Sequence, residues 1–325
     1  MPQSTYKKRL VFLSALAAIL AVIYILALVF DPARHGGRAF AWLEPRLHPL
    51  ADRIEISGPS GDSVLIRRND VWFLTAAGIE YPVRQQRVQD LFAVLSRRDV
   101  YSLRSASLEA REPLGLSLEN ASRILVRGGV GLPLLDLLIG ISGAVGREVY
   151  LARAYEREIY SGEDRFTLFT DSGPEFWLDF RLSGGDPRPA AMIQQAEVTF
   201  APADAPPFSY SLIRSGSGWA LQGIEAAEVV SFRVEDWLRA VMEAEGSGFA
   251  AHPPAVVHGS ITLWFGDGTN RSIQIGTLEA SGEESGANSG GEAVIAAAVS
   301  DSPLVYVLSA WTVSRLFRES GEFLW

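Results

Sequence analysis

The sequence predicts an α+β protein in which an N-terminal transmembrane helix is followed by two repeated modules, each a mostly antiparallel sheet with a packed helix. Three observations support this architecture: an uncharged apolar run at residues 10–30, alternation of apolar and polar residues along many short segments, and an ordered recurrence of these patterns in the second half of the chain. The 325 residues suffice for two domains of ordinary size.

The run from Leu10 to Phe30 contains no charge and no proline. As a helix it would span ~32 Å at ~1.5 Å per residue, close to the ~30 Å of a hydrocarbon core. Lys7, Lys8 and Arg9 precede it, so the positive-inside rule predicts a cytoplasmic tail at 1–9. The remainder would then be translocated. The sequence thus predicts a single-pass protein of the inner (cytoplasmic) membrane that contacts lipid through residues 10–30, with a periplasmic or extracytoplasmic body.

A cleavable signal peptide and a buried soluble helix are the alternatives to this anchor. The apolar region of a signal peptide is usually ~7–15 residues and ends in a small-x-small site, whereas this run ends in Leu28-Val29-Phe30-Asp31-Pro32. A buried soluble helix fits poorly, because the run is apolar on every face.

Charge and cysteine content exclude several classes of function. The formal net charge is −9, and an acidic body argues against binding to a phosphate backbone, which needs clustered Lys and Arg. The chain has no cysteine, which rules out disulfides, thiol catalysis and cysteine-based zinc sites.

The predicted first module covers residues 51–182, after a juxtamembrane connector at 31–50. Alternating apolar residues in 54–56 and 64–66 predict strands, separated by a turn at 58–62. The spacing of Val88, Leu91, Phe92 and Leu95 predicts an amphipathic helix over 84–98. Further strands are expected at 122–127, 134–141, 147–152 and 157–161.

The predicted second module covers residues 192–325, after a polar Gly/Pro linker at 183–191. It repeats the order of the first: strands, a turn before Trp219 that matches the turn before Trp72, and a helical stripe of Val234, Trp237, Leu238 and Val241. Gly266-Asp267-Gly268 predicts a hairpin turn. Residues 279–292 are expected to form a low-complexity loop.

The sequence predicts no catalytic, cofactor-binding or metal-binding residues. There is no phosphate-binding loop, dinucleotide fingerprint or nucleophile elbow. The histidines lack the spacing of a metal pair and are interpreted as surface residues: His35, His48, His252 and His258. The pairs Glu156/Glu158 and Glu283/Glu284 lie in predicted loops, and Trp72 and Trp219 are interpreted as core residues rather than ligand platforms.

The order of short motifs resembles the bacterial domain-of-unknown-function family DUF4340. The motifs are Asp52-Arg53-Ile54-Glu55-Ile56, Asp70-Val71-Trp72-Phe73-Leu74, Glu112-Pro113-Leu114-Gly115-Leu116, Leu138-Ile139-Gly140 and Val149-Tyr150-Leu151 with Ile159-Tyr160. The resemblance covers roughly residues 50–180. It implies a membrane-anchored extracytoplasmic protein, often encoded beside gliding-motility-type ABC transporter components. No catalytic residues or cofactors are implied.

We therefore expect a non-enzymatic accessory or scaffold protein of an ABC-type transport or gliding-motility-like complex, with a membrane protein as its partner and no nucleic-acid ligand. The alternative is an extracytoplasmic module that binds a peptide or a glycan between the repeats. A cell-wall hydrolase with a hidden carboxylate pair is the third hypothesis, and it needs two acidic residues facing each other across a cleft.

Overall fold

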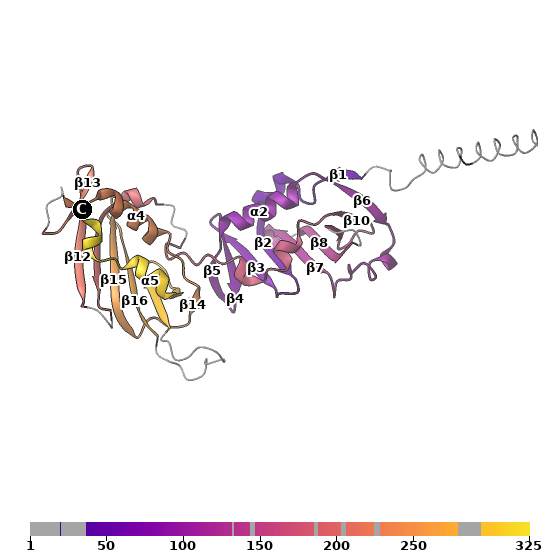
Figure 1. Cartoon of the computed structure of the whole chain (residues 1–325). Helices are drawn as coiled ribbons and strands as arrows, with labels where there is room; N and C mark the ends of the chain where they lie inside the picture. Colours follow the sequence, from indigo (N-terminus) through magenta and orange to yellow (C-terminus); the bar gives the residue numbers. More distant parts are fainter. Residues whose placement is uncertain are drawn as a thin grey trace, which may run out of the picture. The chain divides into compact units, whose positions relative to one another are not determined.

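The computed structural model describes residue 20 and residues 37–131, 133–143, 147–184, 188–202, 206–223, 228–278 and 294–325. The chain divides into two compact units, Met1–Trp177 and Leu178–Trp325. Each unit is built on one antiparallel sheet (Figure 1). The predicted linker at 183–191 falls inside the second unit.

The first unit contains a ten-stranded sheet with the order β1-β6-β10-β9-β8-β7-β2-β3-β4-β5. Its strands are β1 (Arg38–Phe40), β2 (Ala51–Ser57), β3 (Ser63–Arg68), β4 (Val71–Ala76), β5 (Ile79–Pro82), β6 (Asp99–Ser105), β7 (Ser122–Gly128), β8 (Pro133–Ser142), β9 (Glu148–Arg153) and β10 (Ile159–Glu163). Its helices are η2 (Pro45–Leu50), α2 (Gln85–Ser96), η3 (Leu108–Ala110), η4 (Gly129–Gly131), α3 (Thr167–Thr170) and η5 (Pro174–Phe176).

The second unit contains an eight-stranded sheet with the order β13-β12-β11-β15-β16-β17-β18-β14. Its strands are β11 (Ile193–Phe200), β12 (Phe208–Ser215), β13 (Gly218–Leu221), β14 (Gly248–Ala250), β15 (Val256–Phe265), β16 (Asn270–Thr277), β17 (Ile295–Val299) and β18 (Val305–Leu308). Its helices are η6 (Ala190–Met192), α4 (Ser231–Met242), α5 (Ala310–Leu316) and η8 (Ser320–Phe323).

The two sheets share one strand order once β1 and β5 are set aside. The strands correspond in chain order: β2, β3 and β4 match β11, β12 and β13, β6 matches β14, and β7, β8, β9 and β10 match β15, β16, β17 and β18. The long helix follows the third shared strand in both units, as α2 in the first and α4 in the second. The described structure is therefore one antiparallel framework used twice.

The fold class needs correction from α+β to mainly β. Two antiparallel sheets of ten and eight strands dominate the described residues, and the two longest helices have 12 residues each. The individual predicted strands at 122–127, 134–141, 147–152 and 157–161 are confirmed by β7, β8, β9 and β10. The error arose because local periodicity detects single elements and not how many strands join one sheet.

The predicted membrane segment needs correction as well. Among the described residues, no helix combines the length and the apolar character needed to cross a bilayer. Apart from Leu20, the segment Leu10–Phe30 lies outside the described residues. The described helices are short and amphipathic because they cover sheets. The expectation of a single-pass inner-membrane protein with a transmembrane signal anchor and a periplasmic body is therefore without support from the described helices.

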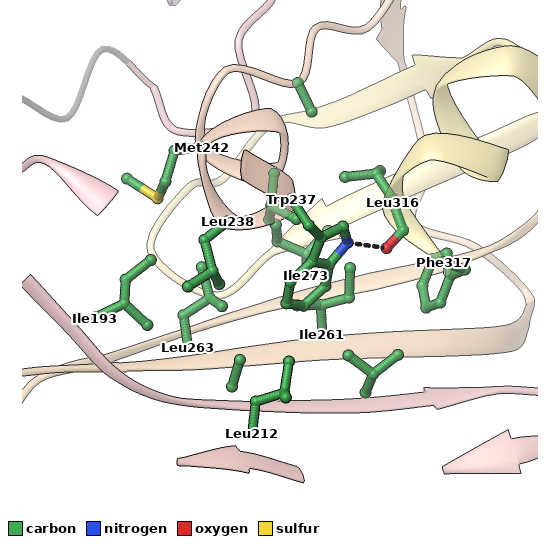
Figure 2. Packing of buried hydrophobic residues seen from close by; sticks show 14 of the residues in the cluster. Ile193, Leu212, Trp237, Leu238, Met242, Ile261, Leu263, Ile273, Leu316 and Phe317 are labelled. Carbon is green, nitrogen blue, oxygen red and sulfur yellow. Dashed lines mark hydrogen bonds between the residues drawn. The ribbon is translucent and has the colours of Figure 1, made fainter. Parts of the chain in front are cut away.

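The core of the second unit forms between one sheet face and helices α4 and α5. Val234, Trp237, Leu238 and Val241 lie on one side of α4, and each is at most 1% exposed. Burial of each such side chain stabilises the fold by about 1.5–3 kcal/mol relative to exposure. Figure 2 shows the Trp237 ring among sheet residues, with its indole nitrogen donating a hydrogen bond of 2.9 Å to the Leu316 carbonyl.

In both units, hydrogen bonds to the first residue of the long helix join that helix to the third shared strand. In the first unit the Gln85 side chain accepts a hydrogen bond from the Trp72 backbone nitrogen at 3.0 Å and donates to the Trp72 carbonyl at 2.9 Å. In the second unit the Ser231 hydroxyl accepts from the Trp219 backbone nitrogen at 3.0 Å. Gln85 and Ser231 are the first residues of α2 and α4, so each fixes the start of the helix to the third shared strand.

Two glycines, one in each sheet, allow another backbone segment to approach closely. A Cβ atom at Gly140 in β8 would lie 2.2 Å from the Leu114 carbonyl oxygen, and one at Gly276 in β16 would lie 1.8 Å from the Val256 carbonyl oxygen. Each site leaves no room for any side chain, so glycine is required at both.

We predict that Trp237→Phe destabilises the second unit by about 1–3 kcal/mol, because the buried Leu316 carbonyl loses its donor. Urea unfolding measures the change. Phe232→Leu is the matched control on the same helix, since Phe232 is 72% exposed, and it should change stability little. Equal losses in the two variants would contradict the packing described.

We predict that Gly276→Ala lowers stability by more than about 2 kcal/mol, because the new methyl group forces two backbones apart. Gly248→Ala is the control, since a Cβ there meets nothing within 4 Å. Thermal unfolding of both variants tests this. An unchanged melting temperature of Gly276→Ala would contradict the close backbone approach at this position.

Candidate functional site

His48 is a structural residue of the first unit. Its ring lies 4.7 Å from the Phe92 ring, and its Nε2 shares a hydrogen bond with the Ser96 hydroxyl. Burial lowers the His48 pKa below its ordinary value. The imidazole is therefore held in the neutral form against α2.

The other two described histidines, His252 and His258, do not belong to a metal site. His258 in β15 shares a hydrogen bond of 3.2 Å with the Thr277 hydroxyl, and His252 is exposed in a loop. His35 lies outside the described residues. Across the described part of the chain, no group of three or more His, Asp or Glu side chains could hold a metal ion.

Of the two acidic pairs singled out in the sequence, the described one does not line a cleft. Glu156 and Glu158 are both exposed, and Glu156 pairs with Arg153 at 3.5 Å. Glu283 and Glu284 lie outside the described residues.

Asp267 closes the hairpin turn between β15 and β16. Its carboxylate accepts hydrogen bonds from the Thr269 backbone nitrogen at 2.9 Å and the Thr269 hydroxyl at 2.6 Å. These bonds, more than the nearby Arg188, hold the pKa of Asp267 below its ordinary value. Gly268 has φ 83°, as the turn requires. The hairpin-turn interpretation of this segment is confirmed.

Trp72 and Trp219 lie in the cores of the two units. They are 7% and 1% exposed, and a guanidinium from the neighbouring strand lies over each ring: Arg67 at 5.9 Å and Arg214 at 4.6 Å. The core interpretation is confirmed, since neither ring is free to take a ligand.

A shallow hollow lies between the C-terminal end of α4 and α5. Its volume is about 230 Å³, below the ~300–1,000 Å³ of typical ligand pockets. Trp311 at its edge is 66% exposed, and the Arg315 guanidinium lies 4.6 Å from its ring centre. The hollow is too small and open to enclose a ligand.

The outer face of the second sheet is the best candidate for a binding surface. It lies opposite the face covered by α4 and α5, and its side chains alternate with core residues along β11, β12, β15 and β16. We call it the open face and define it as Gln195, Glu197, Thr199, Ser209, Ser211, Ile213, Ser260, Thr262, Trp264, Asn270, Ser272 and Gln274. Ser211 is its buried member, at 4% exposed.

Strand register arranges the open face in three rows across four strands. The rows are Ile213–Gln195–Trp264–Asn270, Ser211–Glu197–Thr262–Ser272 and Ser209–Thr199–Ser260–Gln274. Hydroxyl and amide groups dominate them, and each can both donate and accept hydrogen bonds. Glu197 is the one charged member of the open face.

Some of these groups hydrogen-bond within the open face itself. The Thr199 and Ser209 hydroxyls are 3.2 Å apart, and those of Thr262 and Ser272 are 3.4 Å apart. The Gln195 amide nitrogen also donates to the Ser211 hydroxyl at 3.4 Å. These contacts are long, and the exposed members of the face keep further donors and acceptors for solvent.

The corresponding face of the first sheet carries ion pairs. Glu55, which lies between the core residues Ile54 and Ile56, pairs with Arg53 at 2.8 Å and Arg127 at 3.0 Å. Burial alone would raise the Glu55 pKa, but the hydrogen bonds and charges of the two arginines lower it overall.

Arg123 and Asp136 form a second pair on this face, through two hydrogen bonds of 2.7 Å each. Asp136 is 7% exposed. A bidentate pair of this kind fixes both geometry and charge, so the carboxylate is already satisfied.

A chain segment also covers part of this first face. Leu116 is fully buried against Leu138, Ala152 and Ile159. Arg111 in the same segment donates hydrogen bonds to the backbone carbonyls of residues 153 and 154 at 2.7 and 2.8 Å. The first face is therefore neutralised and partly closed by its own chain.

The open face was not predicted from the sequence. Its signal is the polar half of the strand alternation: Ser, Thr, Gln and Asn in 195–199, 209–211, 260–262 and 270–274, against Arg and Glu in 53–55 and 123–127. Assigning these residues to one surface requires the strand register, which connects segments far apart in the chain.

Comparisons with models of known protein families, with curated proteins and with solved structures found no match to this chain.

We predict that part of the loss of thermal stability between pH 7.5 and pH 5 comes from His48. Its pKa in the folded state is lowered, so the unfolded chain takes up a proton more readily, and the contribution to stability is lost as pH falls below about 6.5. Melting temperatures at both pH values test this. The fall should shrink in His48→Gln and persist in the control His252→Gln, whereas an identical fall in His48→Gln would contradict the assignment.

Proposed function

We propose that the protein is a non-enzymatic accessory or scaffold component whose units bind other molecules through their sheets. The observation that carries this proposal is the contrast between the two outer faces on a shared framework. On the first face, charged side chains form ion pairs with one another and residues 108–121 cover part of the surface. The second face has neither ion pairs nor a covering segment among the described residues. Retention of the framework with divergence of its outer residues favours a role in binding, because in the second unit the core lies on the opposite face of the sheet.

The resemblance to DUF4340 provides the candidate partner, a component of an ABC-type transporter or of a gliding-motility-like complex. The edge of the first sheet offers a contact surface for it. Strand β5 extends this sheet beyond the shared strands and lies at its end, with Ile79 48% exposed. An edge strand presents unpaired backbone groups that a partner strand can complete.

We predict that the tagged full-length chain, crosslinked in the cells that encode it, co-purifies with transporter or motility subunits. Ile79→Lys should reduce their recovery, because a charge on an edge strand opposes pairing. The control Leu168→Lys changes a side chain that is 60% exposed in α3 of the same unit and should not alter recovery. Mass spectrometry that finds no such subunits with the unmodified chain would contradict the proposal.

A further inference from the structure

We infer that the open face of the second sheet binds a neutral glycan chain. This inference rests on the proposed binding role and names a ligand class for one surface of the second unit. Three properties of the open face carry it: a carboxylate without a cation, rows of hydroxyl and amide groups, and an aromatic ring beside them.

The Glu197 carboxylate lacks the cationic partners that the equivalent Glu55 has in the first unit. Glu197 lies between Ala196 and Val198 as Glu55 lies between Ile54 and Ile56, so the two glutamates occupy equivalent places in the shared framework.

The residues around the two glutamates differ. Register places Gln195 where the first sheet has Arg53, and Trp264 where it has Arg127. The two arginines that neutralise Glu55 are thus replaced by an amide and an indole, and Glu197 makes no ion pair in the described structure. A free carboxylate of this kind accepts hydrogen bonds from hydroxyl groups.

The rows of polar side chains form a regular grid. Neighbouring strands lie about 4.8 Å apart, and alternate residues along a strand lie about 6.8 Å apart. Groups that both donate and accept therefore repeat in two directions around Thr262. A polyhydroxylated chain presents the same mixture of donors and acceptors along its length, so it can meet several rows at once.

Trp264 contributes the apolar element of the face. It is partly exposed and lies beside Gln195 on the neighbouring strand. An indole combines a flat apolar surface with a polar N–H group. The apolar C–H faces of sugar rings suit such a surface, while their hydroxyl groups reach the neighbouring amide and carboxylate.

Charge and area argue against other occupants. The open face carries no Lys or Arg, which disfavours phosphate backbones and acidic lipids. Four strands by three rows cover roughly 400 Å². A stable protein–protein interface buries about 800 Å² on each partner, so a second copy docked on this surface alone would be held weakly.

Calorimetric titration of the full-length chain with cellohexaose and with chitohexaose tests the inference, and the two sugars distinguish a plain from an N-acetylated chain. We expect at least one to bind. Trp264→Ala should weaken binding by about tenfold or more, through loss of the stacking surface. Trp311→Ala should leave affinity unchanged, because that exposed indole lies on α5 in the same unit.

Thr262→Arg is a second variant, and unlike Trp264→Ala it removes no large side chain that could affect folding. It places a long cation in the middle row and should abolish binding while the melting temperature stays close to that of the unmodified chain. Absence of binding to both sugars at millimolar concentration, or equal affinity of Trp264→Ala and the unmodified chain, would overturn the inference. Preferential binding of pentalysine would overturn it in favour of a cationic ligand. Recovery of transporter subunits by the crosslinked chain is independent of these results, so the two proposals can fail separately.

Discussion

The structure of each unit depends on the covering of one sheet face by helices, chiefly by the 12-residue amphipathic helix α2 in the first unit and α4 in the second. In the second unit Trp237 combines two roles, since its ring is fully buried against the sheet and its indole nitrogen holds the Leu316 carbonyl of α5 (Figure 2). An indole buried without a hydrogen-bond partner is costly, so this contact fixes α5 relative to α4. Because the inner face is closed in this way, the outer face carries little of the stability.

This division explains how two units of one design can differ in surface. Features that packing requires recur in both units. They are the strand order, the helix after the third shared strand, and a glycine at a close backbone approach, Gly140 or Gly276. In the first unit some outer residues, such as Leu138 and Ala152, pack against Leu116, but no such requirement acts on the other outer residues. The first unit uses them for ion pairs such as Arg123–Asp136, and the second replaces those charges with hydroxyl and amide groups.

Local patterns in the sequence predicted individual elements well and their assembly poorly. The apolar stripe predicted a helix at 84–98, and α2 covers Gln85–Ser96, because helical periodicity is a property of neighbouring residues. The fold class was wrong because sheet size depends on pairing between distant strands. For the same reason Trp42, 1% exposed, was assigned to a connector although it belongs to the core of the first unit. The open face was missed because only register brings Glu197, Thr262 and Ser272 into one row.

One side of the second sheet is core and the other is free surface, and because the chain has no cysteine this difference can be measured directly. Thr262 and Leu263 are adjacent in β15 but point to opposite sides, and Leu263 is fully buried. Maleimide labelling of folded Thr262→Cys and Leu263→Cys compares the two sides. We predict rapid labelling at 262 and labelling at 263 only after unfolding. Protection at 262, or equal rates at both positions, would contradict it.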